Sequence, residues 1–267
     1  MIKPGEIQNK AREDGVRDQQ IEKDYILSWI LQGIAQHEQL STVLVFKGGT
    51  VLKKVYFEDY RFSEDLDFTL LDNDILNEQI FKWFCEVFEY IQEEANIPLE
   101  IIDNNEHEDG GINFYITYVG PLGGIGTNKQ VKVDVSKSEQ LQFDPVMQGT
   151  FLGYSDQEEH QLLCYSLEEV LVEKLRSVMQ RMQARDFYDI WYLLEIHEMD
   201  VAFYSIDFRE KCESKEIDPT EFHKKLEQRL PQYKGRWKSS MADQIPDLPD
   251  FDQVEREVMR NLKKLKL

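Results

Sequence analysis

The chain has 267 residues and a formal net charge of −20, with 41% hydrophobic and 12% aromatic residues. The apolar content excludes a disordered chain, the length suits two modest domains, and the acidic charge excludes broad, non-specific attraction to a phosphate backbone. Three scattered cysteines indicate reduced thiols, and no segment has the length and apolar character of a membrane span, so the sequence predicts a cytoplasmic protein with no membrane partner.

The N-terminal part of the chain alternates helix and strand patterns. Helices are predicted over residues 18–37, 50–56 and 74–95, and strands over residues 42–46, 65–71, 98–102, 113–119 and 130–135. Polar and apolar residues alternate in the second of these strands, which places its two aspartates on one face. These elements predict an α/β front half.

The pattern becomes helical from Ser166 onward. Ser166 and Glu169 have the spacing of a capping box, in which the serine caps the helix and the glutamate reaches back to it. A helix to about residue 182 and a second over 185–196 are expected.

Prolines and the change of pattern divide the rest of the chain. Helix breakers are expected at Pro231, Pro246 and Pro249. The simplest division is an α/β domain over residues 1–160 and a helical domain over residues 161–267, with the boundary near 155–166.

Asp65 and Asp67 form the first chemical signal. They lie two positions apart on a predicted strand, so both carboxylates point to the same face. Mg²⁺ prefers oxygen ligands, and two metal ions held by such carboxylates can activate an attacking hydroxyl and ease the departure of pyrophosphate. Asp134, flanked by valines on another predicted strand, is the candidate third carboxylate. For this motif alone, the alternative is an exposed strand edge.

Gly48 and Gly49 lie between a predicted strand and a predicted helix. Two glycines let the backbone approach a triphosphate closely, and the start of the following helix offers free N–H groups. Thr50 can add a hydroxyl, and Lys47 can balance phosphate charge. The alternative is a helix start that needs glycine only for a turn, which explains one glycine better than two.

Arg61 and Ser63 lie just before the aspartate pair. Their position makes them candidates for contacts with the phosphates of a nucleotide. The alternative is a surface loop with a structural salt bridge.

Charged residues also gather on two consecutive helices of the second half. Lys174 can neutralise charge that develops on phosphates. Arg185 and Asp189 form an i,i+4 pair near Asp186, so an interhelical ion-pair network is an equal alternative. The five histidines show no metal-ligand spacing and are assigned no role.

Taken in order, these motifs resemble those of the AbiEii-type nucleotidyltransferases, the toxin components of type IV toxin–antitoxin and abortive-infection systems. The matching runs are KGGT at 47–50, RFSEDLDF at 61–68, KVDV at 132–135, LEEVLVEKL at 167–175 and ARDFYDI at 184–190. The resemblance covers roughly residues 18–195, and its motifs are specific in combination.

The resemblance implies an α/β (α+β) fold, a DNA-polymerase-β-like nucleotidyltransferase core with a mixed sheet and a helical C-terminal domain. It implies a nucleoside triphosphate substrate, Mg²⁺ (or Mn²⁺) as cofactor, a tRNA acceptor end and a cognate antitoxin. Carried over by position, Asp65 and Asp67 would bind metal, and the later motifs would bring Lys174 and Asp186 into the active site. The residues near the phosphates would be Gly48, Gly49, Thr50 and Ser63.

Two other functions remain open from the sequence. Residues 65–69 also match the DxDx[TV] opening of haloacid-dehalogenase-like phosphatases, although that motif should end an apolar strand and the run RFSE at 61–64 precedes it. The non-enzymatic alternative is a nucleotide-binding protein of the same fold without transfer activity.

Overall fold

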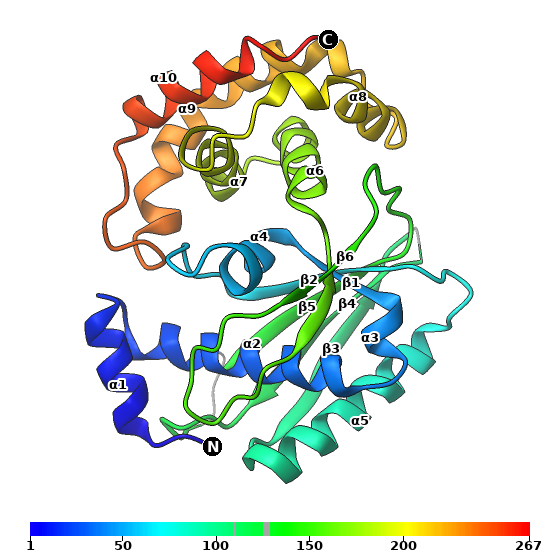
Figure 1. The fold of residues 1–267 in the computed structure, drawn as a ribbon, viewed down its shortest axis with the longest axis vertical. Coiled ribbons are helices and arrows are strands. Elements are labelled where there is room, and N and C mark those ends of the chain that lie inside the picture. The colour runs from blue at the N-terminus through cyan, green and yellow to red at the C-terminus, as the bar shows by residue number, and fades with distance from the viewer. Residues whose placement is uncertain (109, 125–128) are drawn as a thin grey trace. The chain divides into compact units, whose positions relative to one another are not determined.

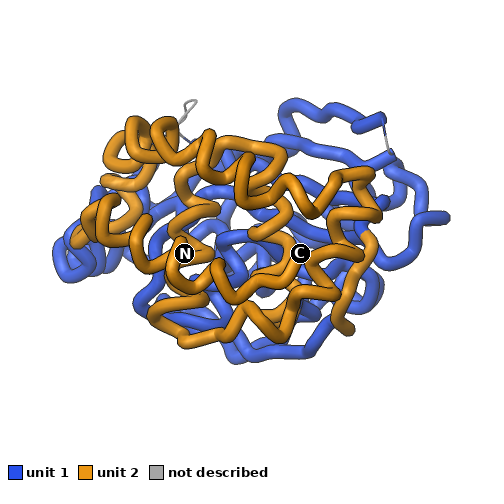
Figure 2. Tube along the Cα trace, turned by 90° about the horizontal axis from the view of Figure 1, so that it is seen from above, with its two compact units in different colours: residues 1–139, 145–165 blue, residues 140–144, 166–267 orange. Residues whose placement is uncertain are grey.

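The protein is described by a computed structural model that covers residues 1–108, 110–124 and 129–267. The chain divides into two compact units (Figure 2). The first contains residues 1–139 and 145–165, and the second contains residues 140–144 and 166–267. Within the described residues, no helix is both long enough and apolar enough to cross a membrane.

A mixed sheet forms the centre of the first unit (Figure 1). Its seven strands among the described residues are β1 (Leu44–Lys47), β2 (Asp65–Leu70), β3 (Leu99–Glu106), β4 (Ile112–Tyr118), β5 (Gln130–Ser136), β6 (Val146–Gly149) and β7 (Gln161–Cys164). They follow the order β3-β4-β5-β2-β1-β7-β6. β2 runs antiparallel to β1 and parallel to β5, which confirms the predicted mixed sheet.

The helices of the first unit are α1 (Pro4–Glu13), α2 (Asp18–Gln36), the short α3 (Leu40–Val43) and α4 (Gly48–Val51), the π-helical turn η1 (Leu52–Tyr56) and α5 (Asn77–Ala95). α2 and α5 lie on the same side of the sheet (Figure 1). That side is apolar because every second residue of the inner strands is a buried aliphatic or aromatic side chain. Phe84 of α5 meets Phe114 of β4 edge to face, with 5.0 Å between ring centroids.

The opposite face of the sheet is polar. Along β2, β4 and β5, the residues that alternate with the buried apolar ones are polar and, except for the buried Thr69, half-buried, which the periodicity of residues 65–71 and 130–135 predicted. Two strands were missed: β6 and β7 are four residues each, too short for alternation to reveal. The start of the predicted strand at 42–46 is helical, as part of α3.

The second unit is helical, as predicted. Its elements are α6 (Leu167–Gln180), α7 (Ala184–Trp191), the π-helical turn η2 (Tyr192–Ile196), the 3₁₀ turns η3 (Val201–Tyr204) and η4 (Pro219–Glu221), α8 (Ser205–Glu213), α9 (Phe222–Met241) and α10 (Phe251–Leu262). Aromatic rings join three of these helices. Phe187 of α7 stacks on Tyr233 of α9 at 5.4 Å, and Phe251 of α10 lies 5.8 Å from Phe187.

The prediction that Pro231 breaks a helix is wrong. Pro231 lies inside α9, a helix of 20 residues that continues to Met241. α9 buries Leu226 before the proline, and Tyr233 and Trp237 after it. Packing on both sides of Pro231 therefore offsets the backbone hydrogen bond that the proline removes.

The predicted capping box is half correct. The Ser166 hydroxyl accepts a hydrogen bond from the Glu169 N–H at 3.3 Å and caps α6. The Glu169 carboxylate does not reach back. It accepts hydrogen bonds from the N–H groups of Gln142 and Phe143 at 2.7 and 3.0 Å and pairs with Lys211 at 2.7 Å. This buried carboxylate therefore fastens residues 140–144 to the second unit.

Candidate active site

Asp65 and Asp67 occupy the first and third positions of β2, a central strand of the sheet. The alternative of an exposed strand edge is therefore wrong. In the ladder, Asp67 lies opposite Lys47 on β1 and opposite Asp134 on β5. Because directly paired residues share a face, the polar face brings together the three predicted carboxylates and Lys47.

Both glycines are required by their neighbours. Gly48 has a φ of +80°, and a Cβ at this position would overlap the Asp67 carboxylate. A Cβ at Gly49 would overlap the guanidinium of Arg61. The pair therefore does more than permit a turn, because it lets the start of α4 lie directly against Asp67 and Arg61.

The other residues near this helix start are packed into the first unit. The Thr50 hydroxyl donates a hydrogen bond to the Asp65 carbonyl at 2.5 Å, which ties α4 to the first residue of β2. The Lys47 ammonium donates to the Ser136 hydroxyl at 3.1 Å. Arg61 and Ser63 are buried, so the alternative of a surface loop is wrong.

Asp134 has a lysine and a histidine beside it on the polar face. Its carboxylate lies 3.6 Å from the Lys132 ammonium and 3.5 Å from His107 Nε2. Sequence reasoning gave His107 no role because the histidine is distant from Asp134 along the chain. The β3–β4 hairpin brings them together: Asn113 of β4 pairs with Asp134, and the Asn113 amide lies 3.3 Å from His107 Nε2.

The chemistry of these side chains fits a magnesium ion that is completed by its substrate. Across residues 1–108, 110–124 and 129–267, no three histidine, cysteine, aspartate or glutamate side chains form a group that could hold a metal ion. Mg²⁺ is commonly bound by one or two carboxylates and by substrate phosphates. Asp65 and Asp67 supply such a pair, and the role of Asp134 as a third ligand stays a prediction.

The remaining predicted residues lie in the second unit. Lys174 of α6 places its ammonium 2.8 Å from Asp186 Oδ1 and 2.6 Å from Asp189 Oδ2, both on α7. Arg181, which follows α6, binds the Asp186 carboxylate at 2.7 and 3.0 Å. Lys174 thus bridges two carboxylates, an arrangement that sequence spacing did not reveal because the expected cation was Arg185.

The electrostatics of this cluster favour an ionised Asp186. Burial opposes ionisation of the carboxyl, but the Lys174 ammonium and the Arg181 guanidinium outweigh it and lower the pKa of Asp186. A buried, multiply paired carboxylate of this kind occurs in structural networks and in active sites alike.

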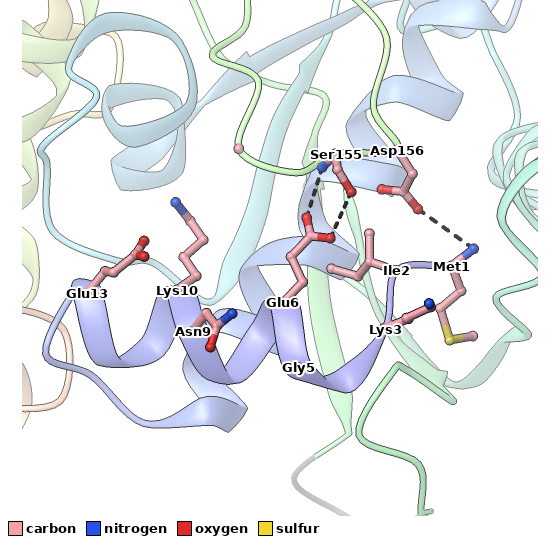
Figure 3. A pocket seen from close by; sticks show the side chains of 11 residues that line it. Met1, Ile2, Lys3, Gly5, Glu6, Asn9, Lys10, Glu13, Ser155 and Asp156 are labelled. Atoms are coloured by element: carbon pink, nitrogen blue, oxygen red, sulfur yellow. Dashed lines mark hydrogen bonds and ion pairs between the residues drawn. The ribbon is translucent and has the colours of Figure 1, made fainter.

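A pocket of about 830 Å³ lies elsewhere in the first unit (Figure 3). It is lined by α1 and by residues of the segment 153–156. Glu6 crosses from α1 to accept hydrogen bonds from the Ser155 N–H and hydroxyl at 3.0 and 2.7 Å. The N-terminal ammonium of Met1 lies 3.7 Å from Asp156. The described lining residues include none of the predicted site residues, so this pocket is separate from the aspartate pair.

Comparison with known protein families adds an independent finding. Residues 29–257 match the family model described as the nucleotidyl transferase AbiEii toxin of type IV toxin–antitoxin systems. A comparison with curated protein sequences finds no significant match.

Solved structures show the same fold. MenT4, a nucleotidyltransferase toxin from Mycobacterium tuberculosis, is 17% identical, with a TM-score of 0.64 over 99% of this chain and 90% of its own. JHP933 from Helicobacter pylori is 16% identical, with a TM-score of 0.58 over 94% of this chain and 93% of its own. These similarities support the predicted α/β nucleotidyltransferase fold.

Proposed function

The chain belongs to the AbiEii family of nucleotidyltransferase toxins of type IV toxin–antitoxin systems, and we propose that it transfers a nucleoside monophosphate from a nucleoside triphosphate to RNA, at the acceptor end of tRNA. In this reaction an acceptor hydroxyl oxygen forms a bond to the α-phosphorus. The bond from the α-phosphorus to the oxygen that bridges to the β-phosphorus breaks, pyrophosphate leaves with the electron pair, and the hydroxyl proton passes to solvent. Membership of a toxin–antitoxin family also implies a cognate antitoxin.

The observation that carries this proposal is the contact between the glycine pair and the aspartate pair. Gly48 brings the start of α4 against Asp67, while Thr50 fixes the same helix start to the Asp65 carbonyl. Backbone N–H groups and carboxylates are thus held side by side. This combination suits a triphosphate that is bound together with Mg²⁺.

The side chains have distinct proposed roles. Asp65 and Asp67 would hold Mg²⁺, with Asp134 as a third ligand, and Mn²⁺ is a substitute with the same ligand preference. When bound, the metal would neutralise charge on the phosphate oxygens and on the leaving pyrophosphate. The backbone at Gly48 and Gly49 would orient the phosphates.

The roles of four further residues are proposed from their positions and from the motif match. Arg61 and Ser63 precede the aspartate pair and would contact the phosphates, as would Lys47 from β1. Lys174, which pairs with Asp186 and Asp189 within the second unit, is proposed as a catalytic residue from its motif alone.

The position of the aspartates also bears on the phosphatase alternative. A phosphatase nucleophile of the DxDx[TV] type should end an apolar strand. Asp65 instead begins β2, and the apolar residues follow it. This geometry and the family match both favour nucleotidyl transfer.

Transfer can be tested by incubating the protein with each labelled nucleoside triphosphate, Mg²⁺ and total tRNA. We expect label on RNA with the wild type and a loss of at least about 100-fold in Asp67→Asn, since the metal ligand is removed. Asp72→Asn is the matched control, because Asp72 is exposed just beyond β2. Nucleotide binding without transfer to RNA would instead support the binding-protein alternative.

The metal assignment needs its own measurement. Isothermal titration of the protein with Mn²⁺ and a non-hydrolysable triphosphate should show binding that weakens in Asp67→Asn and is unchanged in Asp72→Asn. Equal binding by both variants would contradict the assignment of Asp67 as a ligand.

A further inference from the structure

A second group of polar side chains lies on the polar face, beside the aspartate pair. In the ladder, Asp65 pairs with Lys132 on β5, and Lys132 pairs with Tyr115 on β4. In the next row, Asn113 of β4 pairs with Asp134. We call Asn113, Tyr115 and Lys132 the β4–β5 polar patch.

The three side chains of this patch are half-buried and therefore accessible from one side. Within the described part of the chain, the Tyr115 side chain makes no ring contact or hydrogen bond, so the face of its ring is not stacked. Among the described residues, the Lys132 ammonium pairs with Asp134, at 3.6 Å. An unstacked aromatic ring beside a cation is the combination with which proteins bind single-stranded nucleic acid.

The patch has a clear limit. On β3, the residue opposite Tyr115 is the exposed Asp103, and Glu106 follows at the end of the strand. Acidic side chains repel a phosphate backbone, so the patch ends at β4 and has room for only the last nucleotides of a strand.

The patch lies on the β5 flank of the aspartate pair. β2 separates two neighbours: β1, which leads into Gly48 and Gly49, and β5, which carries Lys132. In phosphoryl and nucleotidyl transfer, the attacking and leaving oxygens lie roughly in line. If the glycine pair holds the leaving pyrophosphate at the β1 flank, the attacking hydroxyl must arrive from the β5 flank.

The distances agree with this arrangement. Neighbouring strands are about 4.8 Å apart, so Tyr115 lies two strand spacings, about 10 Å, from Asp65. A terminal hydroxyl near the aspartate pair would therefore leave a base close to the Tyr115 ring.

We propose that the β4–β5 polar patch binds the single-stranded end of the acceptor RNA, with a base stacked on Tyr115 and a phosphate paired with Lys132. Asn113 donates a hydrogen bond to the same nucleotides. The proposal rests on the proposed function for the side from which the acceptor arrives, but the patch can be tested by binding alone.

The test measures binding of a fluorescently labelled, short single-stranded RNA to the full chain by anisotropy. Tyr115→Ala should raise the Kd by roughly 5- to 100-fold, the range for loss of one base–aromatic stack, whereas Tyr115→Phe should bind like the wild type. Lys132→Ala should weaken binding less and make it less sensitive to salt. The affinity for the nucleoside triphosphate should stay unchanged in the two Tyr115 variants, which also shows that they are folded.

Matched controls come from the other side of the sheet. Tyr90 and Lys82 lie on α5, which packs on the apolar face, and both are partly or fully exposed. Tyr90→Ala and Lys82→Ala should leave RNA binding unchanged.

The outcomes separate this inference from the proposed function. Equal RNA affinity in Tyr115→Ala and Tyr90→Ala, or no RNA binding by the wild type, overturns the patch as an acceptor site. Transfer of label to protein in place of RNA also overturns it. If Tyr115→Ala loses RNA binding while the wild type transfers no nucleotide, the patch stands and the proposed function fails.

Discussion

Gly48→Ala tests whether the glycine pair serves the aspartate pair. At Gly48 the φ of +80° is strained for alanine, and the new Cβ would also lie 3.1 and 3.2 Å from Cγ and Cβ of Asp67, with closer overlap at the carboxylate. The backbone strain alone costs about 1–2 kcal/mol. The overlap adds a displacement, because Asp67 is fixed on a central strand and its carboxylate must swing aside.

A second glycine separates the two effects. Gly124 also has a φ of +80°, but a Cβ there meets no atom within 4 Å among the described residues. Gly124→Ala therefore carries the backbone strain without the overlap. Both variants should lose the unfolding free energy that the backbone strain costs, and Gly48→Ala should lose more because of the overlap with Asp67. The measurement is urea titration with two spectroscopic probes whose transitions coincide.

Activity should distinguish them. Displacing a catalytic group by about 1 Å can lower the rate by about 100-fold, so we expect a loss of this size in kcat for Gly48→Ala and little change for Gly124→Ala. The assay is nucleotide transfer to RNA at saturating triphosphate. Equal kcat values in the two variants would refute the argument that Gly48 exists to admit Asp67.

Three further predictions concern buried charge and burial. Lys174→Met removes a cation 2.6 Å from Asp189 and should lower the unfolding free energy by about 3 kcal/mol. If the loss is below about 1 kcal/mol and activity is gone, the ion pairs of Lys174 with Asp186 and Asp189 are not a structural network. Glu169→Gln takes the carboxylate from the fully buried Lys211 and should cost about 3 kcal/mol in urea unfolding, more than an exposed Glu→Gln change. Burial raises the pKa of Tyr233 from 10 to about 12, so the stability that its neutral form contributes is complete below pH 10 and lost as the pH rises through 12. Between these pH values the unfolding free energy of Tyr233→Phe should fall by roughly 1–2 kcal/mol less than that of the wild type. Parallel curves of unfolding free energy against alkaline pH would contradict this.

The face of the strand on which each carboxylate lies was predictable, because it depends on the alternation of polar and apolar residues along the sequence. Alternation along residues 65–71 placed Asp65 and Asp67 on one face, and the valines around Asp134 placed its carboxylate on the corresponding face of another strand. The sequence could not show that these strands are neighbours in parallel register. That pairing joins Asp67 to Asp134 across residues far apart in the chain.

The contacts that give each side chain its setting were not predictable, because they join distant elements. Gly49 is small to admit Arg61, and Lys174 bridges two carboxylates on the following helix. Tyr115 lies beside Lys132 only because β4 pairs with β5, which the sequence did not show. Motif spacing selected the candidate residues of the first unit, while the sheet ladder determined which strands place them side by side.

The acidic composition constrains how the proposed acceptor RNA can bind to this protein. Each lysine–phosphate contact contributes a salt-dependent term to affinity, and a chain with a net charge of −20 cannot gain a general attraction to nucleic acid from its overall field. The β4–β5 polar patch contains one lysine, and acidic residues follow it on β3. Binding there must therefore depend mainly on stacking and hydrogen bonding at the end of the strand. Such contacts select a single-stranded terminus over a duplex, whose bases are already stacked, and this selection is what an enzyme that extends an RNA end requires.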